Sequence, residues 1–440
     1  MKLFFILFIL LFISHCSFDN KTGIWKNENN ISKKDNIFVE FKSIDSSRES
    51  FDKIIQIDPN FKFSITKKIN NFEWKDVFYN KSNNFDNFDY NYLNKIISRS
   101  KKVSRYKVNN YLLLENKNVL INDQKGNLII YSIEKKKTIR KYNFYKKKFK
   151  KIKKNLNLVI EKNIIYVSDN LGYLYAYNYI DNKILWAKYY KVPFRSNIKL
   201  TNEKLLAANQ NNILFFFDKN TGDILKTIPT EETILNNQFV NNLSLNMESA
   251  FFLNTYGSLY SIDIKTMKLN WFLNLNQSFD LNPTELFMSK PIINNADKIV
   301  VSSSFFTYII NSNNGSIDYK FNFNSTIKPL MINNFLFSLT AGGLLISMNL
   351  DNGNVIYSYD INQKIAEFLN VKKKQVTAKG IYIADNKLLI FLNNSYLLKL
   401  DIYGNLESVN KLPAKLNTSP IFIDKFLLFL DYKNKILTVN

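Results

Sequence analysis

Cysteine and histidine are almost missing from this sequence: Cys16 and His15 are the only residues of either type among 440. A single cysteine cannot form a disulfide within the chain, so packing alone must hold the fold together. Thiolates and imidazoles are also the commonest ligands of zinc, copper and haem, and histidine is the commonest general base. We therefore predict a non-enzymatic protein with no catalytic, cofactor-binding or metal-binding residues and no cofactor.

Glycine is scarce as well, whereas aromatic residues are abundant. The chain has 11 Gly against 37 Phe and 25 Tyr, and 46% of its residues are hydrophobic. Aromatic side chains are enriched in β-strands. This composition favours a strand-rich domain with a large core over a helical bundle.

Acidic residues are outnumbered, which gives a formal net charge of +23. Such an excess would suit nucleic-acid binding, because lysines that neutralise phosphates release counterions. The excess is mostly lysine spread along the chain beside asparagine and isoleucine, as AT-rich coding produces whatever the function. Together with the targeting signal described next, this spread leads us to expect no nucleic-acid partner.

The N-terminus reads as a secretory signal. Lys2 precedes an apolar run from Leu3 to Ile13, which is too short for a comfortable membrane span. The run ends Ile-Ser-His-Cys, which resembles the lipobox of bacterial lipoproteins, although His15 replaces the usual small residue. We predict a signal peptide over 1–15, a palmitate-bearing lipid anchor on Cys16, and attachment to the periplasmic face of the outer membrane. The alternative is an ordinary signal with a chance cysteine.

Residues 16–60 are polar and show no sustained period of 2 or 3.6, which predicts a flexible tether. Residues 61–440 are predicted to form one domain, because a repeat dominates them. The stretch Gly172–Trp186 (GYLYAYNYIDNKILW) is an alternating strand, a polar turn and a second strand. Its relatives open at eight anchor positions: Gly126, Gly172, Asn212, Gly257, Phe305, Gly343, Asn394 and Asn434.

The anchors run from 126 to 434 in seven steps, which averages 44 residues. A four-stranded blade of a β-propeller needs about 40 to 50 residues. We therefore predict an all-β fold, an eight-bladed propeller of four-stranded antiparallel blades.

Three positions of the repeat fix its register. Eight of the 11 glycines lie at an anchor or ten residues beyond one, where a turn needs positive φ. Pro291, Pro329 and Pro420 each open an earlier strand, where proline removes no ladder hydrogen bond. Trp186 and Trp271 lie fourteen residues past their anchors and are predicted to wedge between neighbouring blades.

The eighth anchor, Asn434, leaves no room for an outer strand before the chain ends at Asn440. A strand from the N-terminal segment should therefore close the last blade and remove the open edge. Ile69–Trp74 (INNFEW) matches the endings of the other outer strands and is the predicted closing strand. Tyr90–Ser98 is a candidate short helix.

These repeats resemble the PQQ-type propeller repeat of quinoprotein alcohol dehydrogenases, and the lipidated eight-bladed chain resembles the BamB family. That resemblance implies a scaffold that docks on the barrel-inserting subunit of the outer-membrane assembly machinery and aids nascent outer-membrane proteins, as a monomer within a hetero-complex. The family's contact patch includes a hydrophobic-x-hydrophobic-Arg loop, which Val192-Pro193-Phe194-Arg195 matches. Glu231 and Glu232 are the nearest candidates for the acidic part of that patch. The alternative is that Phe194 packs under its own blade and Arg195 is a solvated charge.

Two other functions stay open. A PQQ-dependent dehydrogenase would need a quinone in the funnel, a calcium held by carboxylates, an aspartate base and adjacent cysteines, and this chain has no cysteine pair. Its repeat aspartates Asp218 and Asp263 are simpler as turn-forming residues. A periplasmic propeller that binds a peptide, ligand or glycan leaves no compact motif and is the stronger alternative.

Residues 135–154 hold 12 Lys or Arg in 20 positions. This stretch suits either contact with anionic lipid or an acidic partner, or a solvated loop at a blade edge.

Overall fold

A computed structural model describes residues 16–18, 25–27, 50–232, 240–276 and 286–440. The chain divides into two compact units, Met1–Glu49 and Ser50–Asn440. In the first unit, strand β1 (Cys16–Phe18) pairs antiparallel with β2 (Trp25–Asn27). The predicted signal peptide, 1–15, lies outside the described residues. Within the described part, no helix is long and apolar enough to cross a membrane.

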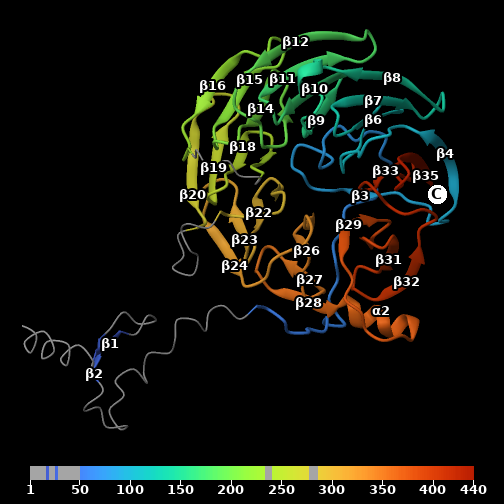
Figure 1. The fold of residues 1–440 in the computed structure, drawn as a ribbon. Helices are drawn as coiled ribbons and strands as arrows, with labels where there is room; N and C mark the ends of the chain where they lie inside the picture. The colour runs from blue at the N-terminus through green and yellow to red at the C-terminus, as the bar shows by residue number, and fades with distance from the viewer. Residues whose placement is uncertain (1–15, 19–24, 28–49, 233–239, 277–285) are drawn as a thin grey trace, which may run out of the picture. The chain divides into compact units, whose positions relative to one another are not determined.

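The second unit is a ring of eight antiparallel sheets, which confirms the predicted eight-bladed propeller (Figure 1). Blade 1 consists of β5 (Leu113–Glu115), β6 (Asn118–Asn122), β7 (Asn127–Ser132) and β8 (Lys137–Asn143), and blade 2 of β9 (Leu156–Glu161), β10 (Ile164–Asp169), β11 (Tyr173–Asn178) and β12 (Lys183–Tyr189). Blade 3 consists of β13 (Lys199–Leu200), β14 (Lys204–Ala208), β15 (Leu214–Asp218) and β16 (Ile224–Ile228), and blade 4 of β17 (Asn242–Leu245), β18 (Ser249–Leu253), β19 (Ser258–Asp263) and β20 (Leu269–Asn274). In each blade the first strand is innermost and the last is outermost.

Blades 5 to 7 repeat this order. Blade 5 consists of β21 (Ile293–Asn294), β22 (Lys298–Ser302), β23 (Thr307–Asn311) and β24 (Ile317–Phe321). Blade 6 consists of β25 (Leu330–Ile332), β26 (Phe335–Leu339), β27 (Leu344–Asn349) and β28 (Val355–Asp360). Blade 7 consists of β29 (Ala378–Ala384), β30 (Lys387–Leu392), β31 (Tyr396–Leu400) and β32 (Leu406–Lys411). Blade 7 gains an inner fifth strand, β3 (Asn87–Phe88), which runs parallel to β29.

The core lies between adjacent blades, because the middle strands are covered on both faces. All six residues of β7 are buried, whereas outer strand β12 alternates between exposed and covered positions. Between blades 1 and 2, Tyr142 stacks on Tyr177 with ring centroids 4.3 Å apart, and Phe144 stacks on Tyr175 at 4.4 Å. Burial on both faces explains why the middle strands read as nearly continuous apolar runs.

The turn prediction is confirmed, because the four glycines ten residues past an anchor have φ between +71° and +85°. The four glycines at anchors also have positive φ, between +82° and +89°. Gly222 also answers a second need. A Cβ atom there would lie 2.5 Å from the Trp186 ring, so the tight turn and the neighbouring tryptophan both require glycine.

The wedge prediction is also confirmed, and other residue types fill the same position. Trp186 Nε1 donates to the Lys219 carbonyl at 3.1 Å, and Trp271 Nε1 donates to the Ser312 carbonyl at 3.0 Å, each in a turn of the next blade. Equivalent bonds to the next blade come from Arg140, Tyr319 and Tyr357. The repeat therefore keeps a donor that reaches the next blade more often than it keeps tryptophan.

We expect Tyr357→Phe to lower the free energy of unfolding by about 1–2 kcal/mol, because it leaves the buried Ile402 carbonyl without the Tyr357 hydroxyl, 3.1 Å away. Tyr319→Phe removes the equivalent bond at an exposed site and should cost less than about 0.5 kcal/mol. Urea denaturation of both variants checks this. If both variants lose the same free energy of unfolding, burial does not make this hydrogen bond between blades more stabilising.

The last blade is closed by an N-terminal strand, as predicted, but the predicted segment was wrong. Blade 8 consists of β33 (Ile421–Ile423), β34 (Phe426–Leu430), β35 (Lys435–Val439) and, outermost, β4 (Ile96–Lys102). Ser98 Oγ donates to Thr438 Oγ1 at 3.0 Å. The helix proposed over 90–98 is also wrong, because its end belongs to strand β4, whose largely exposed residues suit an outer edge.

Ile69–Trp74, the predicted closing strand, instead begins a segment that circles the inside of the ring. We call residues 69–91 the strap. It contacts all eight blades in turn through these pairs: Asn71 with Phe422, Trp74 with Leu114, Asp76 with Val159 and Lys199, Lys81 with Leu245, Ser82 with Asn294, Asn84 with Met331, Asn87 with Ile383, and Tyr90 with Lys425. Trp74 is buried against Tyr79 and Phe88 of the strap itself, which is why its tryptophan does not serve as an outer-strand wedge.

A charged cluster fixes the strap to blade 3. Lys199 is fully buried, and its Nζ donates to Asp76 Oδ2 at 2.8 Å and to the Asn80 carbonyl at 2.9 Å. Asn83 continues the attachment, because its amide donates to the carbonyls of Leu243 in blade 4 and Ile292 in blade 5, at 2.8 and 2.7 Å. The strap is therefore part of the core.

Three smaller features complete the unit. Helix α2 (Ile361–Leu369) follows β28 and is capped by Asp360, whose side chain accepts from the Asn362 and Gln363 amides. The 3-10 helix η2 (Lys147–Phe149) lies between blades 1 and 2. Ser50 to Asn60, assigned above to the tether, belongs to the second unit, and Ile55 forms a bridge with Ser358 of β28.

Candidate functional site

One face of the ring carries all the connections between blades. Successive strands of a blade run in opposite directions, so the connection from each outer strand to the next inner strand lies at the same end as the turn between the second and third strands. We call this the connection face. Residues 190–198, which join blades 2 and 3, lie on it, as do the described residues 229–232 and 240–241 of the segment that joins blades 3 and 4.

The predicted contact loop is only partly exposed. Val192 and Arg195 are half-buried, but Phe194 is 2% exposed. The Phe194 ring packs on Tyr190 and Phe217 at centroid distances of 6.1 and 6.2 Å. Phe194, predicted above as part of the contact patch, therefore packs under its own blade, which is the alternative given above, because an apolar ring at this point fills the space between blades 2 and 3.

Arg195 is half-buried, and its side chain has no ion-pair partner among the described residues. Its backbone amide donates to the Ala208 carbonyl at 2.9 Å, and its carbonyl accepts from the Asn241 amide at 2.9 Å. The side-chain Nε is buried without a hydrogen-bond partner, and burial lowers the pKa of the guanidinium from its usual value. Within the described ranges no carboxylate pairs with it, so Arg195 presents a cation that is ready to accept a partner.

The two glutamates are exposed at the start of the next connection. Glu231 is held in place, because its backbone amide donates to the Tyr260 hydroxyl at 3.1 Å and its carboxylate accepts from Ser258 Oγ. No interaction is seen for Glu232 among the described residues. The two connections meet where Ser196 forms a parallel bridge with Asn241. The structure thus brings neighbouring loops together, without a direct contact between Arg195 and either glutamate in the part described.

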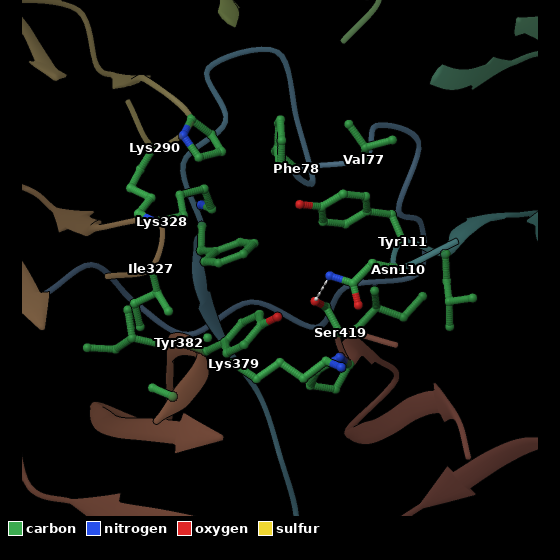
Figure 2. A pocket seen from close by; sticks show the side chains of 18 of the residues that line it. Val77, Phe78, Asn110, Tyr111, Lys290, Ile327, Lys328, Lys379, Tyr382 and Ser419 are labelled. Carbon is green, nitrogen blue, oxygen red and sulfur yellow. Dashed lines mark hydrogen bonds between the residues drawn. The ribbon is translucent and has the colours of Figure 1, made fainter. Parts of the chain in front are cut away.

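A second feature of the connection face was missed from the sequence. The mouth of the central channel is a cavity of about 370 Å³, which we call the mouth cavity. Figure 2 shows Val77 and Phe78 of the strap on one side, with Tyr111 of blade 1 next to them and Ser419 of blade 8 across from Phe78. Opposite Tyr111 lie Lys290 and Lys328. The strap and five blades therefore line this mouth together.

Three lysines, Lys290, Lys328 and Lys379, enter this cavity from blades 5, 6 and 7, and its lining includes no aspartate or glutamate. Burial lowers the pKa of each lysine from its ordinary value, most for Lys328. A sequence signal existed, because Lys290 and Lys328 directly precede the strand-opening prolines Pro291 and Pro329. The lysines were missed because single residues before a strand carry no periodic signal.

The basic stretch 135–154 follows the outer edge of blade 1. It includes strand β8, whose residues are mostly exposed, and the helix η2. Tyr145 fixes it to blade 2, since its hydroxyl donates to Asp169 Oδ2 at 2.5 Å, and Lys154 is buried. The stretch is thus part of the blade and its connection rather than a free extended loop.

Known families and structures agree with this fold. The model of the family "Outer membrane protein assembly factor BamB" matches residues 146–359. No protein with a curated description matches the chain. The fold is similar to BamB from Moraxella catarrhalis, with a TM-score of 0.59 and 11% identity over 79% of this chain and 99% of that one. It is also similar to the computationally designed Ika8 protein (TM-score 0.60, 11% identity, 78% and 99%) and to quinohemoprotein alcohol dehydrogenase from Comamonas testosteroni (0.59, 9%, 83% and 80%).

At such identities the structural likenesses show the fold alone, and the family match adds a resemblance to BamB. The quinoprotein likeness raises the question of a quinone with its calcium. The mouth cavity offers lysine and aromatic side chains but no carboxylate, and no group of three or more His, Cys, Asp or Glu in the described residues could hold a metal ion. This donor set does not fit a calcium-assisted quinone.

Proposed function

We propose that this PQQ-like β-propeller, which resembles BamB, is a non-catalytic scaffold lipoprotein of the outer-membrane β-barrel assembly machinery. It docks on the barrel-inserting subunit and aids the assembly and insertion of outer-membrane proteins. The match of the BamB family model to residues 146–359 carries the proposal. A lipid anchor on Cys16 holds the protein at the periplasmic face of the outer membrane.

The docking patch we propose consists of Val192, Arg195, Glu231 and Glu232, with Phe194 beneath as packing support. Arg195 supports this assignment, because a half-buried cation without a carboxylate partner in the described structure gains from a complementary charge on another protein. The exposed glutamates on the neighbouring connection supply the opposite charge. In such a patch the positive charge of Arg195 and the negative charges of the glutamates lie on the two connections that the Ser196–Asn241 bridge joins. Complementary charges on the partner would therefore fix its orientation.

Affinity purification of the lipidated protein from solubilised outer membranes tests this function. We expect the barrel-inserting subunit to be recovered with it. Recovery of the intact protein without that subunit would contradict the scaffold role and favour a ligand-binding propeller.

Glu232→Lys should reduce the recovery of the barrel-inserting subunit by about tenfold, because like charges at an interface oppose association. The matched control is Glu248→Lys, which makes the same charge change at an exposed turn on the opposite face, between β17 and β18. Thermal unfolding of both variants should match the unmodified protein. If the two variants lower recovery equally, net charge and not the proposed patch controls binding.

A further inference from the structure

The mouth cavity has a volume suited to a small ligand. Its volume of about 370 Å³ lies in the range of small-molecule sites, roughly 300–1,000 Å³. The strap contributes Trp74, Val77 and Phe78 to its lining. This geometry separates the cavity from the docking patch, which lies on loops between blades 2, 3 and 4.

The charges in the cavity are not neutralised by the described part of the protein. Lys328 Nζ donates to the Asn83 carbonyl and lies 3.4 Å above the Phe85 ring centroid. Lys379 Nζ donates to the Asn417 carbonyl at 2.6 Å. The Lys290 ammonium has no hydrogen-bond or ion-pair partner within the described ranges, and only its backbone amide is bonded, to the Ser302 carbonyl at 2.9 Å. Three cations therefore share one concave site with neutral partners or none, an arrangement that costs free energy unless an anion joins them.

Most of the remaining lining is aromatic or apolar, and its polar side chains are Asn110, Thr326, Asn393 and Ser419. Phe78, Tyr111 and Tyr382 border the cavity, and Asn110 Nδ2 donates to Ser419 Oγ at 3.4 Å beside them (Figure 2). Flat rings and lysine ammonium groups together favour a ligand that has both a flat apolar body and a charged oxygen group. Inorganic anions alone would leave the rings unused.

We propose that the mouth cavity binds a small organic anion in which a carboxylate or a phosphate is attached to a flat ring. The oxygen atoms accept from Lys290 and Lys328, which lie on the same side of the cavity in Figure 2, and the ring packs on the aromatic side. The lowered pKa values of the three lysines agree with this, because a bound anion would favour their charged forms. The site is independent of the scaffold role, so failure of either leaves the other standing.

Isothermal titration calorimetry of the purified full chain with benzoate and with phenyl phosphate tests the proposal. We expect one saturable site for at least one of them, and the preferred probe identifies the oxygen group. Benzamide, the neutral ring, and acetate and inorganic phosphate, the ringless anions, should each bind at least about tenfold more weakly.

Lys290→Gln with Lys379→Gln should weaken binding by about tenfold or more, since each removes a charge that faces the ligand in a partly dehydrated site. Lys328 is left intact because it also bonds the strap. The control, Lys183→Gln with Lys226→Gln, removes two exposed lysines from outer strands β12 and β16 and should leave binding unchanged. The proposal is overturned if neither aromatic anion binds, if benzamide binds as tightly as they do, or if both double variants weaken binding equally.

Discussion

Replacing Asp76 by alanine should lower the free energy of unfolding of the propeller by about 3–5 kcal/mol, because it leaves a buried charge without its partner. Lys199 is 0% exposed, and Asp76, 2.8 Å away, supplies its only carboxylate in the described structure. Asp76 Oδ1 also accepts from the Phe78 amide at 3.0 Å. Urea denaturation followed by circular dichroism measures the change.

A second substitution separates the charge from the shape of the site. In Asp76→Ala with Lys199→Met both charges are gone, and a buried pair replaced by apolar residues often costs little. We expect the double variant to be more stable than Asp76→Ala alone by at least about 1 kcal/mol. A double variant that is equally or less stable would show that Lys199 matters through its bonds to the strap backbone and not through its charge.

The loss should also depend on pH. Burial lowers the pKa of Lys199, and Asp76 opposes that shift, so Asp76→Ala lowers this pKa further. Between the folded and unfolded pKa values the unfolded chain binds more protons, so stability rises with pH in that window. The deficit of Asp76→Ala should therefore be largest near neutral pH and shrink as the pH is raised toward the ordinary lysine pKa of 10.5. A deficit that grows with pH would contradict this assignment.

Phe194→Ala should cost about 3–5 kcal/mol, because it empties a packed aromatic site between blades 2 and 3. The side chain is 2% exposed and contacts Phe217 and Tyr190. Tyr189→Ala is the matched control, since Tyr189 is 57% exposed at the end of β12, directly before the same connection, and it should cost less than about 1 kcal/mol. Thermal and urea unfolding of the two variants check the difference.

This result decides how the docking patch can be studied. If Phe194→Ala unfolds the blade, any loss of partner binding by that variant reports on stability and not on contact. Variants of Arg195 or Glu232 keep the packing and test docking directly. A Phe194→Ala protein as stable as the Tyr189→Ala control would instead return Phe194 to the candidate contact residues.

The fold could be predicted from the sequence because each repeat keeps residue types that its local backbone conformation requires. A turn with positive φ needs glycine, so the spacing of Gly222 and Gly353 is enough to set the register of the blades. Trp186 and Trp271 were predictable as wedges for the same reason. The shared requirement was a donor for the next blade, and Arg140 and Tyr357 meet it without resembling tryptophan.

The strap could not be predicted, because its contacts follow no period. Seven of its 23 residues are asparagine, whose amide can donate to and accept from backbone groups in any direction. Asn83 and Asn84 use that capacity on blades 4 to 6. In sequence such a segment looks like a polar loop, and only the closed ring turns it into core.

The sequence predicted where the candidate contact loop lies in the fold, but it did not predict which of its residues are buried. The motif placed Val192 to Arg195 on a connection between blades, but a pattern of residue types carries no information about burial, and Phe194 lies inside. The lysines of the mouth cavity are close together only because three blades meet at the channel, while along the chain they are separated by up to 89 residues (379 − 290).

Closure of blade 8 has a consequence for how the molecule forms. Strand β4 pairs with β35, and Ser98 bonds Thr438 across 340 residues of chain. Contacts of such separation are slow to form, because the entropy of closing the loop is lost before any bond is gained. Without this pairing, blade 8 lacks its outer strand and β35 keeps an unpaired edge. We therefore expect the pairing of β4 with the five-residue strand Lys435–Val439 to be a late step in closing the ring.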